Sequence, residues 1–349
     1  MDPRVPDGPV PARGPRVRRP APVRARRGHR PAPLPDRDGV PPARFSMPTG
    51  TSWGTVAEFL LDRTNGAAEV AGRLSRGEVL LGDGTVVTEH TAYRAGEWIY
   101  LHRDVADEPE VPGELGVVHR DGHIIVVDKP PFLATMPRGA HVTQTIVVRL
   151  RRRPGLEQVS PAHRLDRLTA GLLLLTTDPG VRRDYQELFA QRQVEKVYHA
   201  VVHLDPALEL PGEVRSRIEK PRGRLQAVQV PGEPNAVTRI ELLDRSGALA
   251  LVRLRPLTGR THQLRVHLAG LGAPIVGDPL YPAVVDVARG DFSRPLQLLA
   301  SELAFTDPLS GEPRRFVTGR ALTVGPWGAP GADARESGVD LGNPPLVGP

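Results

Sequence analysis

The run Leu172–Leu175 constrains the fold of this chain more than any other segment. It is wholly apolar and follows the loop His163–Gly171, which carries one carboxylate, Asp166, among arginine and threonine residues. Such a run predicts a buried strand, and a buried strand can hold the loop at its start rigidly. Because Arg164 and Arg167 can keep a neighbouring carboxylate ionised, the segment indicates a site for one nucleophilic or base-acting aspartate. A helix cap or a structural Arg–Asp pair is the alternative, and the spacing alone favours it.

The composition limits the chemistry that the chain can carry. The sequence has 349 residues with 39% hydrophobic content, which is enough for about two domains. It contains no cysteine, which excludes disulfides, thiol catalysis and cysteine metal sites. No apolar run approaches the roughly 18 residues of a membrane span, and the N-terminus lacks the apolar core of a secretory signal. We therefore expect a cytoplasmic protein.

Two tails are predicted to be disordered because their composition cannot form a core. Residues 1–45 are rich in arginine and proline and carry a net charge of +7, whereas the whole chain carries +6. Residues 326–349 are rich in glycine and proline. Because the rest of the chain is near neutral, any nucleic-acid surface there must come from local clustering of charge. An RNA-contacting arm and an extension without a function both remain open for residues 1–45.

Residues 53–103 are predicted to form a small separate module. Apolar spacing indicates two short helices, followed by a hairpin around a Gly-Asp-Gly turn and a closing strand, Trp98–Leu101. This order resembles the S-four-like RNA-binding domain that precedes the catalytic domain of many RNA-modifying enzymes. The resemblance implies that Arg73 and Arg76 contact phosphate. Because the module also carries several acidic side chains, a packing appendage without RNA affinity is the alternative.

From residue 115 onward, predicted strands outnumber predicted helices. Apolar runs and alternating patterns indicate strands at residues 123–127, 172–177, 194–202, 236–242 and 248–255. A helix is expected after Asp178-Pro179, which is a typical cap followed by proline, and another is expected over 261–271. We therefore predict a mixed α+β domain over residues 115–325 with a largely antiparallel central sheet.

Further functional side chains gather in the segment Val194–Ala200. A strand there would place Lys196 and Tyr198 on one face. A tyrosine on such a face can stack on a base or accept a proton through its oxygen, and a half-buried core tyrosine is the alternative. The turn Gly277–Tyr281 is expected to close the site region, although a turn of this kind is usually structural.

The segment Leu257–His267 begins with a Thr-Gly turn and is predicted to open a helix. Helix N-termini attract anions, and Arg260 and Arg265 add a bidentate grip on phosphate or carboxylate. His262 and His267 lie about 140° apart around a helix, whereas two metal ligands on one face are separated by four residues. We therefore expect no metal site.

The order and spacing of four segments closely resemble the RluA-type pseudouridine synthases. The segments are HIIVVDKPPFLATMP (123–137), HRLDRLTAGLLLLT (163–176), FAQRQVEKVYHA (189–200) and PLTGRTHQLRVHLAGLGAPIVGDPLY (256–281). The resemblance implies a pseudouridine synthase fold, preceded by the S-four-like module, and an RNA substrate.

The resemblance also implies roles for individual residues. Asp166 matches the catalytic aspartate, and Arg265 matches the arginine that pairs with it. Tyr198 matches the tyrosine that stacks on the target base and removes the proton from carbon 5, and Arg164 matches an arginine that helps to extrude this base. One departure is Ala170, where family members often have serine. The other substrate-binding residues that we expect are Thr169, Lys196, Arg260, His262 and Gln263.

Together these patterns predict an enzyme that isomerises specific uridines to pseudouridine in structured RNA. Ribosomal RNA is the first expected substrate and transfer RNA the second. The reaction needs no redox change, metal or phosphate donor, so we expect no cofactor, and one carboxylate suffices. A hydrolytic glycosidase normally uses two carboxylates. The main alternative is a non-catalytic RNA-binding or RNA-chaperone protein on the same fold. We expect a monomer that does not bind membranes.

Overall fold

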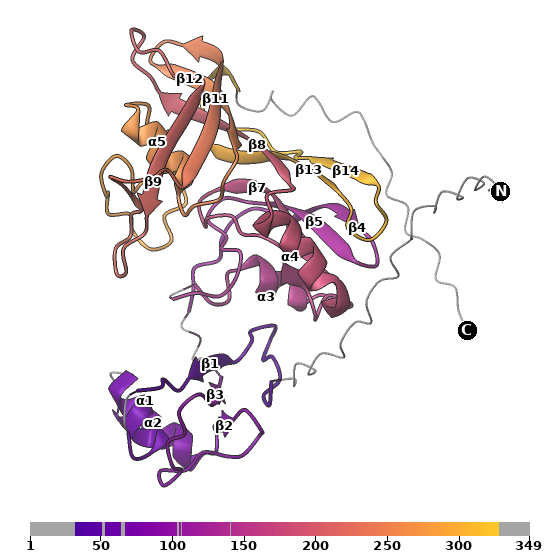
Figure 1. The fold of residues 1–349 in the computed structure, drawn as a ribbon, viewed down its shortest axis with the longest axis vertical. Coiled ribbons are helices and arrows are strands. Elements are labelled where there is room, and N and C mark those ends of the chain that lie inside the picture. Colours follow the sequence, from indigo (N-terminus) through magenta and orange to yellow (C-terminus); the bar gives the residue numbers. More distant parts are fainter. Residues whose placement is uncertain are drawn as a thin grey trace, which may run out of the picture.

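The computed structural model contains a small N-terminal module and a larger part built on one extended sheet (Figure 1). It describes residues 32–327 except 51–52, 64–66, 103–104, 106 and 140. Most of the two predicted tails, residues 1–31 and 328–349, therefore lies outside the described residues. No helix within the described part of the chain is long and apolar enough to cross a membrane.

The small module combines two helices with a three-stranded antiparallel sheet in the order β1-β3-β2. Its elements are β1 (Ala43–Ser46), α1 (Val56–Arg63), α2 (Ala67–Ser75), β2 (Val79–Leu81) and β3 (Trp98–Leu101). Helix α1 begins with a capping box, because Thr55 Oγ1 accepts from the Glu58 N–H at 3.2 Å and the Glu58 carboxylate accepts from the Thr55 N–H at 3.4 Å. The apolar faces of the helices and strands enclose a separate core around Phe59 and Ile99.

The structure corrects two predictions for this region. Residues 43–45, which we assigned to the disordered tail, form β1 together with Ser46 and pair with β3. The tail prediction was too long because proline and arginine dominate the composition and hide a short edge strand. The expected hairpin after β2 is limited to one bridge, Leu80 to Val86, and the main partner of β2 is β3.

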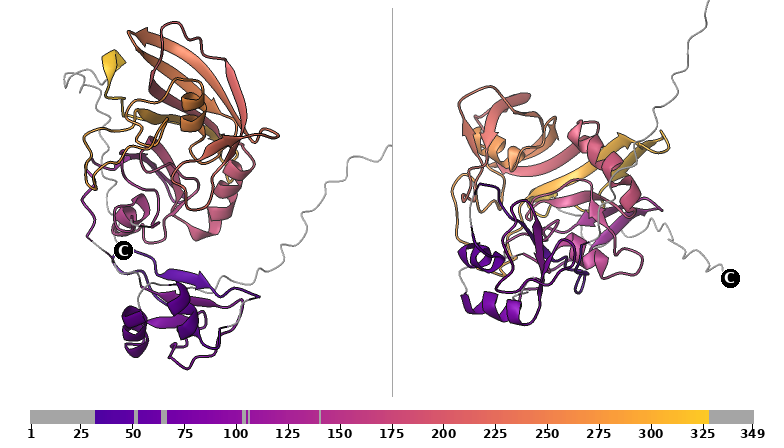
Figure 2. Two further views of the ribbon diagram at one scale, coloured as in Figure 1. Left: turned by 90° about the vertical axis from the view of Figure 1, so that its left-hand side faces the viewer. Right: turned by 60° about the horizontal axis from the view of Figure 1, so that its bottom comes forward.

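The module is joined to the larger part through the segment before β1. Val40 packs on Val142 and Val148 of the larger part, and the Arg151 guanidinium forms an ion pair with Asp36 at 2.6 Å. The two further views show the module as a body beside the large sheet rather than an extension of it (Figure 2).

The described residues of the larger part form an eleven-stranded sheet in the order β10-β9-β11-β12-β8-β13-β7-β5-β4, with β14 on β13 and β6 on β7. The pairing is antiparallel except between β13 and β7, so the predicted α+β fold with a largely antiparallel sheet is confirmed. The strands are β4 (Gly116–Arg120), β5 (Ile124–Lys129), β6 (Ser160–Pro161), β7 (Ala170–Thr176), β8 (Glu195–His203), β9 (Glu213–Glu219), β10 (Val228–Val230), β11 (Ala236–Ser246), β12 (Leu249–Pro256), β13 (Leu298–Thr306) and β14 (Pro313–Val317).

Three α-helices pack on this sheet: α3 (Ile146–Arg151), α4 (Arg182–Ala190) and α5 (Gln263–Gly270). Leu173 and Leu175 of β7 belong to the core cluster that includes α3. Leu172 and Leu174 belong to the cluster that includes Tyr185 and Leu188 of α4. Because both faces of β7 are covered, its sequence is continuously apolar rather than alternating. This central strand holds the loop that carries Asp166.

Gly171 joins that loop to β7 and lies where the chain approaches β13 most closely. Its φ is +106°, and a Cβ added there would lie 2.2 Å from the Ala300 carbonyl oxygen. Backbone cannot yield to such a contact without shifting the parallel pair β7–β13, in which Gly171 is aligned with Ala300. Glycine is therefore required at this position.

We predict that Gly171→Ala lowers the free energy of unfolding by more than about 3 kcal/mol, because it adds both a left-handed backbone cost and a backbone clash. Urea denaturation followed by circular dichroism measures this change. Gly212→Ala is the matched control, since a Cβ there meets nothing within 4 Å, and its effect should stay below about 1 kcal/mol. Equal effects of the two substitutions would contradict the role of Gly171.

Candidate active site

Asp166 lies in a pocket of about 810 Å³ between the loop before β7, the strand β8 and the start of α5. Five cationic side chains line this pocket, and Asp166 is the single carboxylate among its described lining residues. The cations are Arg164, Arg192, Lys196, Arg260 and Arg265. A site of this charge favours a polyanion and surrounds one potential nucleophile or base with positive groups.

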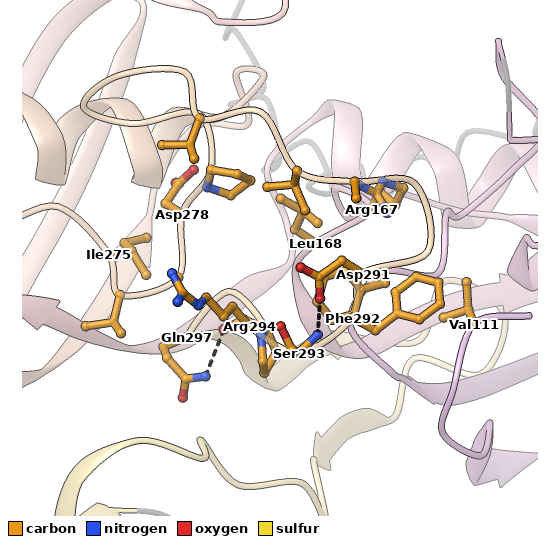
Figure 3. Close-up of a pocket in the computed structure, with 18 of the residues that line it drawn as sticks. Val111, Arg167, Leu168, Ile275, Asp278, Asp291, Phe292, Ser293, Arg294 and Gln297 are labelled. Carbon is orange, nitrogen blue, oxygen red and sulfur yellow. Dashed lines mark hydrogen bonds between the residues drawn. The ribbon is translucent and has the colours of Figure 1, made fainter. Parts of the chain in front are cut away.

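A larger cavity of about 1130 Å³ lies on the other side of the same loop (Figure 3). Arg167 and Leu168 line it together with residues of the segment 274–297. Asp166, Tyr198 and Arg265 are not among its lining residues. We therefore place the chemistry in the smaller pocket, where the predicted site residues converge.

The loop around Asp166 is fixed by two buried side chains, one from the last residue of β5 and one from the segment that follows it. The Lys129 ammonium donates to the carbonyls of Pro130, Leu133 and Arg167 at 2.8–3.1 Å. Thr135 Oγ1 donates to the Leu165 carbonyl at 2.9 Å and accepts from the Leu165 N–H at 3.2 Å. The backbone on both sides of Asp166 is thus held. Burial lowers the pKa of Lys129 to about 7, although the Asp166 carboxylate opposes this shift.

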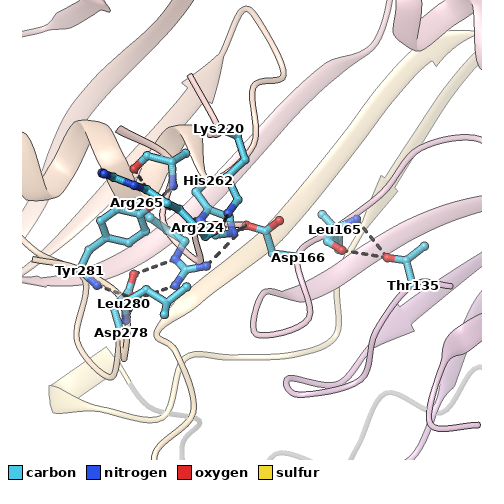
Figure 4. A network of polar contacts seen from close by, with 11 residues as sticks. Thr135, Leu165, Asp166, Lys220, Arg224, His262, Arg265, Asp278, Leu280 and Tyr281 are labelled. Atoms are coloured by element: carbon cyan, nitrogen blue, oxygen red, sulfur yellow. Dashed lines mark hydrogen bonds and ion pairs between the residues drawn. The ribbon is translucent and has the colours of Figure 1, made fainter. Parts of the chain in front are cut away.

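Arg265 links Asp166 to a second carboxylate that is completely buried. Its Nε and Nη2 donate to the two oxygens of Asp278 at 2.8 and 2.6 Å, which is a bidentate pair. Its Nη1 lies 3.7 Å from Asp166 Oδ2. Burial works against the charge of Arg265, but hydrogen bonding and attraction to Asp278, together with Asp166, raise its pKa. Figure 4 shows Arg265 between the two carboxylates.

The expected pairing of Arg265 with Asp166 is therefore the weaker of its two contacts. Asp278 lies in the turn Gly277–Tyr281, which we expected to close the site, and its Oδ1 also accepts from the Leu280 N–H at 2.8 Å. No pattern in the sequence indicated that Asp278 holds Arg265. In the sequence, Asp278 stands out only as an acidic residue next to Gly277, whose φ in the structure is +76°.

His262 is the residue before α5 and faces Asp166 from a left-handed backbone conformation, with φ of 57°. Its Nε2 lies 3.9 Å from Asp166 Oδ2, and its Nδ1 shares a hydrogen bond with the Tyr281 hydroxyl at 2.9 Å. Burial lowers the pKa of His262, and the nearby Asp166 carboxylate only partly offsets this. The imidazole is therefore neutral at neutral pH.

Tyr198 lines the pocket from β8 and is 9% exposed. Lys196, two residues earlier on the same strand, lines it as well. Burial, together with the Asp166 carboxylate, raises the pKa of Tyr198 far above its ordinary value. Tyr198 is thus a neutral phenol whose oxygen can accept a proton or a hydrogen bond. Burial lowers the pKa of Lys196.

Among the other predicted substrate-binding residues, Arg164, Thr169 and Arg260 line the pocket. Gln263 also borders it, but its amide is fully used inside the protein. Its oxygen accepts from Thr258 Oγ1 and the Arg260 N–H, and its nitrogen donates to the Val237 carbonyl and Thr238 Oγ1. Gln263 therefore holds the turn before α5 and has no group left for a substrate, which corrects our prediction.

The second predicted histidine, His267, faces away from this pocket. Its ring nitrogens lie 2.9 Å from Thr238 Oγ1 and 3.0 Å from Ser216 Oγ, and burial lowers its pKa to about 4. It therefore shares no ligand position with His262.

The two predicted phosphate contacts in the small module differ in accessibility. Arg73 is only 6% exposed and donates to Glu69 and to the His102 carbonyl. It supports the module from inside, so our expectation of a phosphate contact was wrong for this residue. Arg76 is exposed and donates to both oxygens of Glu78.

The hairpin between β9 and β10 was not expected from the sequence. This hairpin brings Lys220 and Arg224 close to His262 at the edge of the site (Figure 4). The signal for it was the short basic run KPRGR at residues 220–224.

Comparison with known proteins identifies the family. The family model described as RNA pseudouridylate synthase matches residues 123–270. The ribosomal large subunit pseudouridine synthase D of Xanthomonas campestris is 34% identical over 262 residues, which are 69% of this chain and 77% of that protein. The dual-specificity RNA pseudouridine synthase RluA of Haemophilus influenzae is 33% identical over 217 residues, or 60% of this chain and 94% of that protein.

A eukaryotic relative is similar over a comparable share of the chain. The mitochondrial tRNA pseudouridine(32) synthase of Saccharomyces cerevisiae is 35% identical over 213 residues, which are 60% of this chain and 46% of that protein. The predicted resemblance is thus confirmed by sequence similarity over most of the large part. The chain belongs to the RNA pseudouridylate synthase family and is an RNA pseudouridine synthase similar to RluA and RluD.

Proposed function

We propose that Asp166 is the catalytic group with which this enzyme isomerises specific uridines in structured RNA. The observation that carries the proposal is the charge of the pocket, whose described lining contains Asp166 as its single carboxylate together with five cations. Its carboxylate is 29% exposed and therefore accessible, whereas Arg265 behind it is 2% exposed. A nucleophile or base needs this combination of access and fixed surroundings.

The reaction can proceed with one carboxylate. The bond between C1′ of the ribose and N1 of uracil breaks, the base turns, and a bond forms between C1′ and C5. The hydrogen on C5 leaves as a proton and N1 gains one, so no oxidant or reductant is consumed. Asp166 can attack the nucleotide or remove a proton from the sugar. Hydrolysis by a glycosidase would require a second carboxylate, and the described lining of this pocket contains none.

Tyr198 is suited to receive the base and its proton. It lies on a rigid central strand of the sheet, β8, and borders the same pocket as Asp166. Because its pKa is raised, it acts through a neutral hydroxyl, which can accept the C5 proton only while it passes its own O–H proton to another acceptor. Its ring offers a stacking surface for uracil.

The remaining cations fit the phosphates of an RNA chain from which the target uridine has been extruded. Extrusion costs a few kcal/mol and is least costly in loops, where bases are already unstacked. Arg164 and Arg260 at the pocket wall and the basic hairpin at 220–224 would then bind the flanking backbone. Membership of an enzyme family argues against the alternative of a non-catalytic RNA-binding protein.

We propose ribosomal RNA of the large subunit as the first substrate and transfer RNA as the second. The relative with the longest aligned region among the three described is named for the large ribosomal subunit, and it spans 69% of this chain. The relative from yeast is named for transfer RNA. The S-four-like order of the small module supports the first choice.

We predict that Asp166→Asn removes pseudouridine formation while the fold is kept, because the amide has nearly the same shape but is neither a nucleophile nor a base. Purified protein is incubated with RNA that carries tritium on carbon 5 of uridine, and release of tritium is measured. Asp184→Asn, an exposed acidic residue on α4 outside the pocket, serves as control and should retain full activity. Activity of Asp166→Asn within tenfold of the wild type would refute the assignment.

We predict that Tyr198→Phe strongly reduces turnover but changes RNA affinity only a few-fold. Phenylalanine keeps the stacking surface, worth about 1–3 kcal/mol per base, and loses only the oxygen. Single-turnover rates and equilibrium binding of the same RNA separate the two effects. Normal chemistry on bound RNA, combined with a collapse of affinity, would make Tyr198 a binding residue only.

A further inference from the structure

Asp166 is separated from two neighbouring side chains by gaps of nearly equal size. Its Oδ2 lies 3.9 Å from His262 Nε2 and 3.7 Å from Arg265 Nη1. Both distances are too long for direct hydrogen bonds. An oxygen placed about 2.8 Å from both Oδ2 and Nε2 fits the 3.9 Å separation without crowding. The geometry thus leaves room for one bridging hydroxyl group between Asp166 and His262.

The imidazole of His262 is held so that only Nε2 is available to the pocket. Its Nδ1 is engaged with the Tyr281 hydroxyl at 2.9 Å, and the two rings meet edge to face at 89°. The Tyr281 hydroxyl is itself fixed, since it accepts from the Ala227 N–H at 2.7 Å. The side chain of His262 is only 12% exposed. This anchoring is typical of a side chain that must present one atom at a defined place.

The carboxylate of Asp166 determines which proton arrangement suits this geometry. A negative oxygen 3.9 Å away favours the tautomer that carries the proton on Nε2 over the tautomer that has a lone pair there. The Tyr281 hydroxyl lies 2.9 Å from both Nδ1 and the Ala227 carbonyl oxygen, and in the favoured tautomer its single proton is donated to Nδ1. Nε2 is then a donor and Asp166 an acceptor. A hydroxyl group can satisfy both, because it accepts one hydrogen bond and donates another.

The target nucleotide carries such a hydroxyl next to the reacting atom. If Asp166 acts at the sugar, as one form of the proposed function requires, its carboxylate lies at C1′ or C2′ of the ribose. The 2′-oxygen is bonded to C2′ and therefore falls within reach of the same carboxylate. We propose that His262 Nε2 and Asp166 together bind the 2′-hydroxyl of the target uridine, so that His262 selects ribose over deoxyribose at this position. The 2′-hydroxyl is the group by which proteins distinguish RNA from DNA.

This inference rests on the proposed function and is tested by binding rather than by turnover. The probes are two synthetic stem-loop RNAs that carry the mapped target uridine and differ only in having ribose or 2′-deoxyribose there. Dissociation constants are measured with the inactive Asp166→Asn protein, whose amide oxygen still accepts a hydrogen bond. We expect this protein to bind the ribose form about five- to tenfold more tightly, as for the loss of one hydrogen bond.

The informative variant adds His262→Asn to the same protein. The asparagine amide can replace Nδ1 toward Tyr281 and tolerates a positive φ, but it has no atom at the position of Nε2. We expect the affinity for the ribose form to fall to the affinity for the deoxyribose form. The affinity for the deoxyribose form should itself stay within twofold of its value in the Asp166→Asn protein. His262→Gln, whose amide extends to the position of Nε2, should restore part of the preference. Thermal unfolding of each variant shows whether the fold is kept. If one of these variants is unfolded, His262→Gly is measured in its place.

An unchanged ribose preference in His262→Asn would overturn the role of His262, and so would equal loss of affinity for both RNAs. These results do not depend on turnover. They therefore differ from failure of the proposed function, which would appear as absence of tritium release from the wild-type enzyme.

Discussion

The buried ion pair between Arg265 and Asp278 is the interaction on which the site depends. Both side chains are withdrawn from water, with exposures of 2% and 0%. Removing one partner from such a pair leaves an uncompensated buried charge, at a cost of about 3–5 kcal/mol. The pair therefore fixes the guanidinium, and only its Nη1 faces Asp166. It also ties α5 to the turn Gly277–Tyr281, where Asp278 accepts from backbone N–H groups.

The same turn carries Tyr281, which anchors His262 and lies with its ring 5.2 Å from the Arg265 guanidinium. From the opposite side, Lys129 and Thr135 hold the backbone around Asp166. The carboxylate is thus positioned by β7, the end of β5 and the segment after it, while Arg265 and His262 are positioned by α5 and the turn. This division explains how one half-buried carboxylate can be presented in a defined orientation without a direct hydrogen bond to another side chain among the described residues. It leaves the oxygens of Asp166 accessible to a substrate.

The sequence was sufficient to predict features that depend on local pattern. The strand β7 was predicted because the run Leu172–Leu175 is continuously apolar, and its two covered faces account for this pattern. A cap was predicted from Asp178-Pro179, and Asp178 accepts from the Gly180 N–H at 2.7 Å and so caps the 3-10 turn Pro179–Val181 that leads into α4. The family followed from four segments in the correct order, and the comparisons confirm it.

Features that depend on long-range partners were not predictable in this way. Gln263 has the appearance of a substrate-binding residue, but Thr238 and Thr258 occupy its amide. The sequence suggested that Arg73 is a surface cation, but in the structure it is buried and donates to the His102 carbonyl. Arg265 was expected to pair with Asp166, and only the folded chain shows that Asp278 has the shorter contacts.

The most direct measurement is a map of pseudouridine across all cellular RNA in cells that contain or lack this gene. If the chain acts through Asp166, deletion removes pseudouridine from a discrete set of uridines in structured RNA, and re-expression of the wild type restores it. Re-expression of Asp166→Asn at the same protein level leaves these positions unmodified. An unchanged map after deletion, or restoration by the Asp166→Asn protein, would contradict the account.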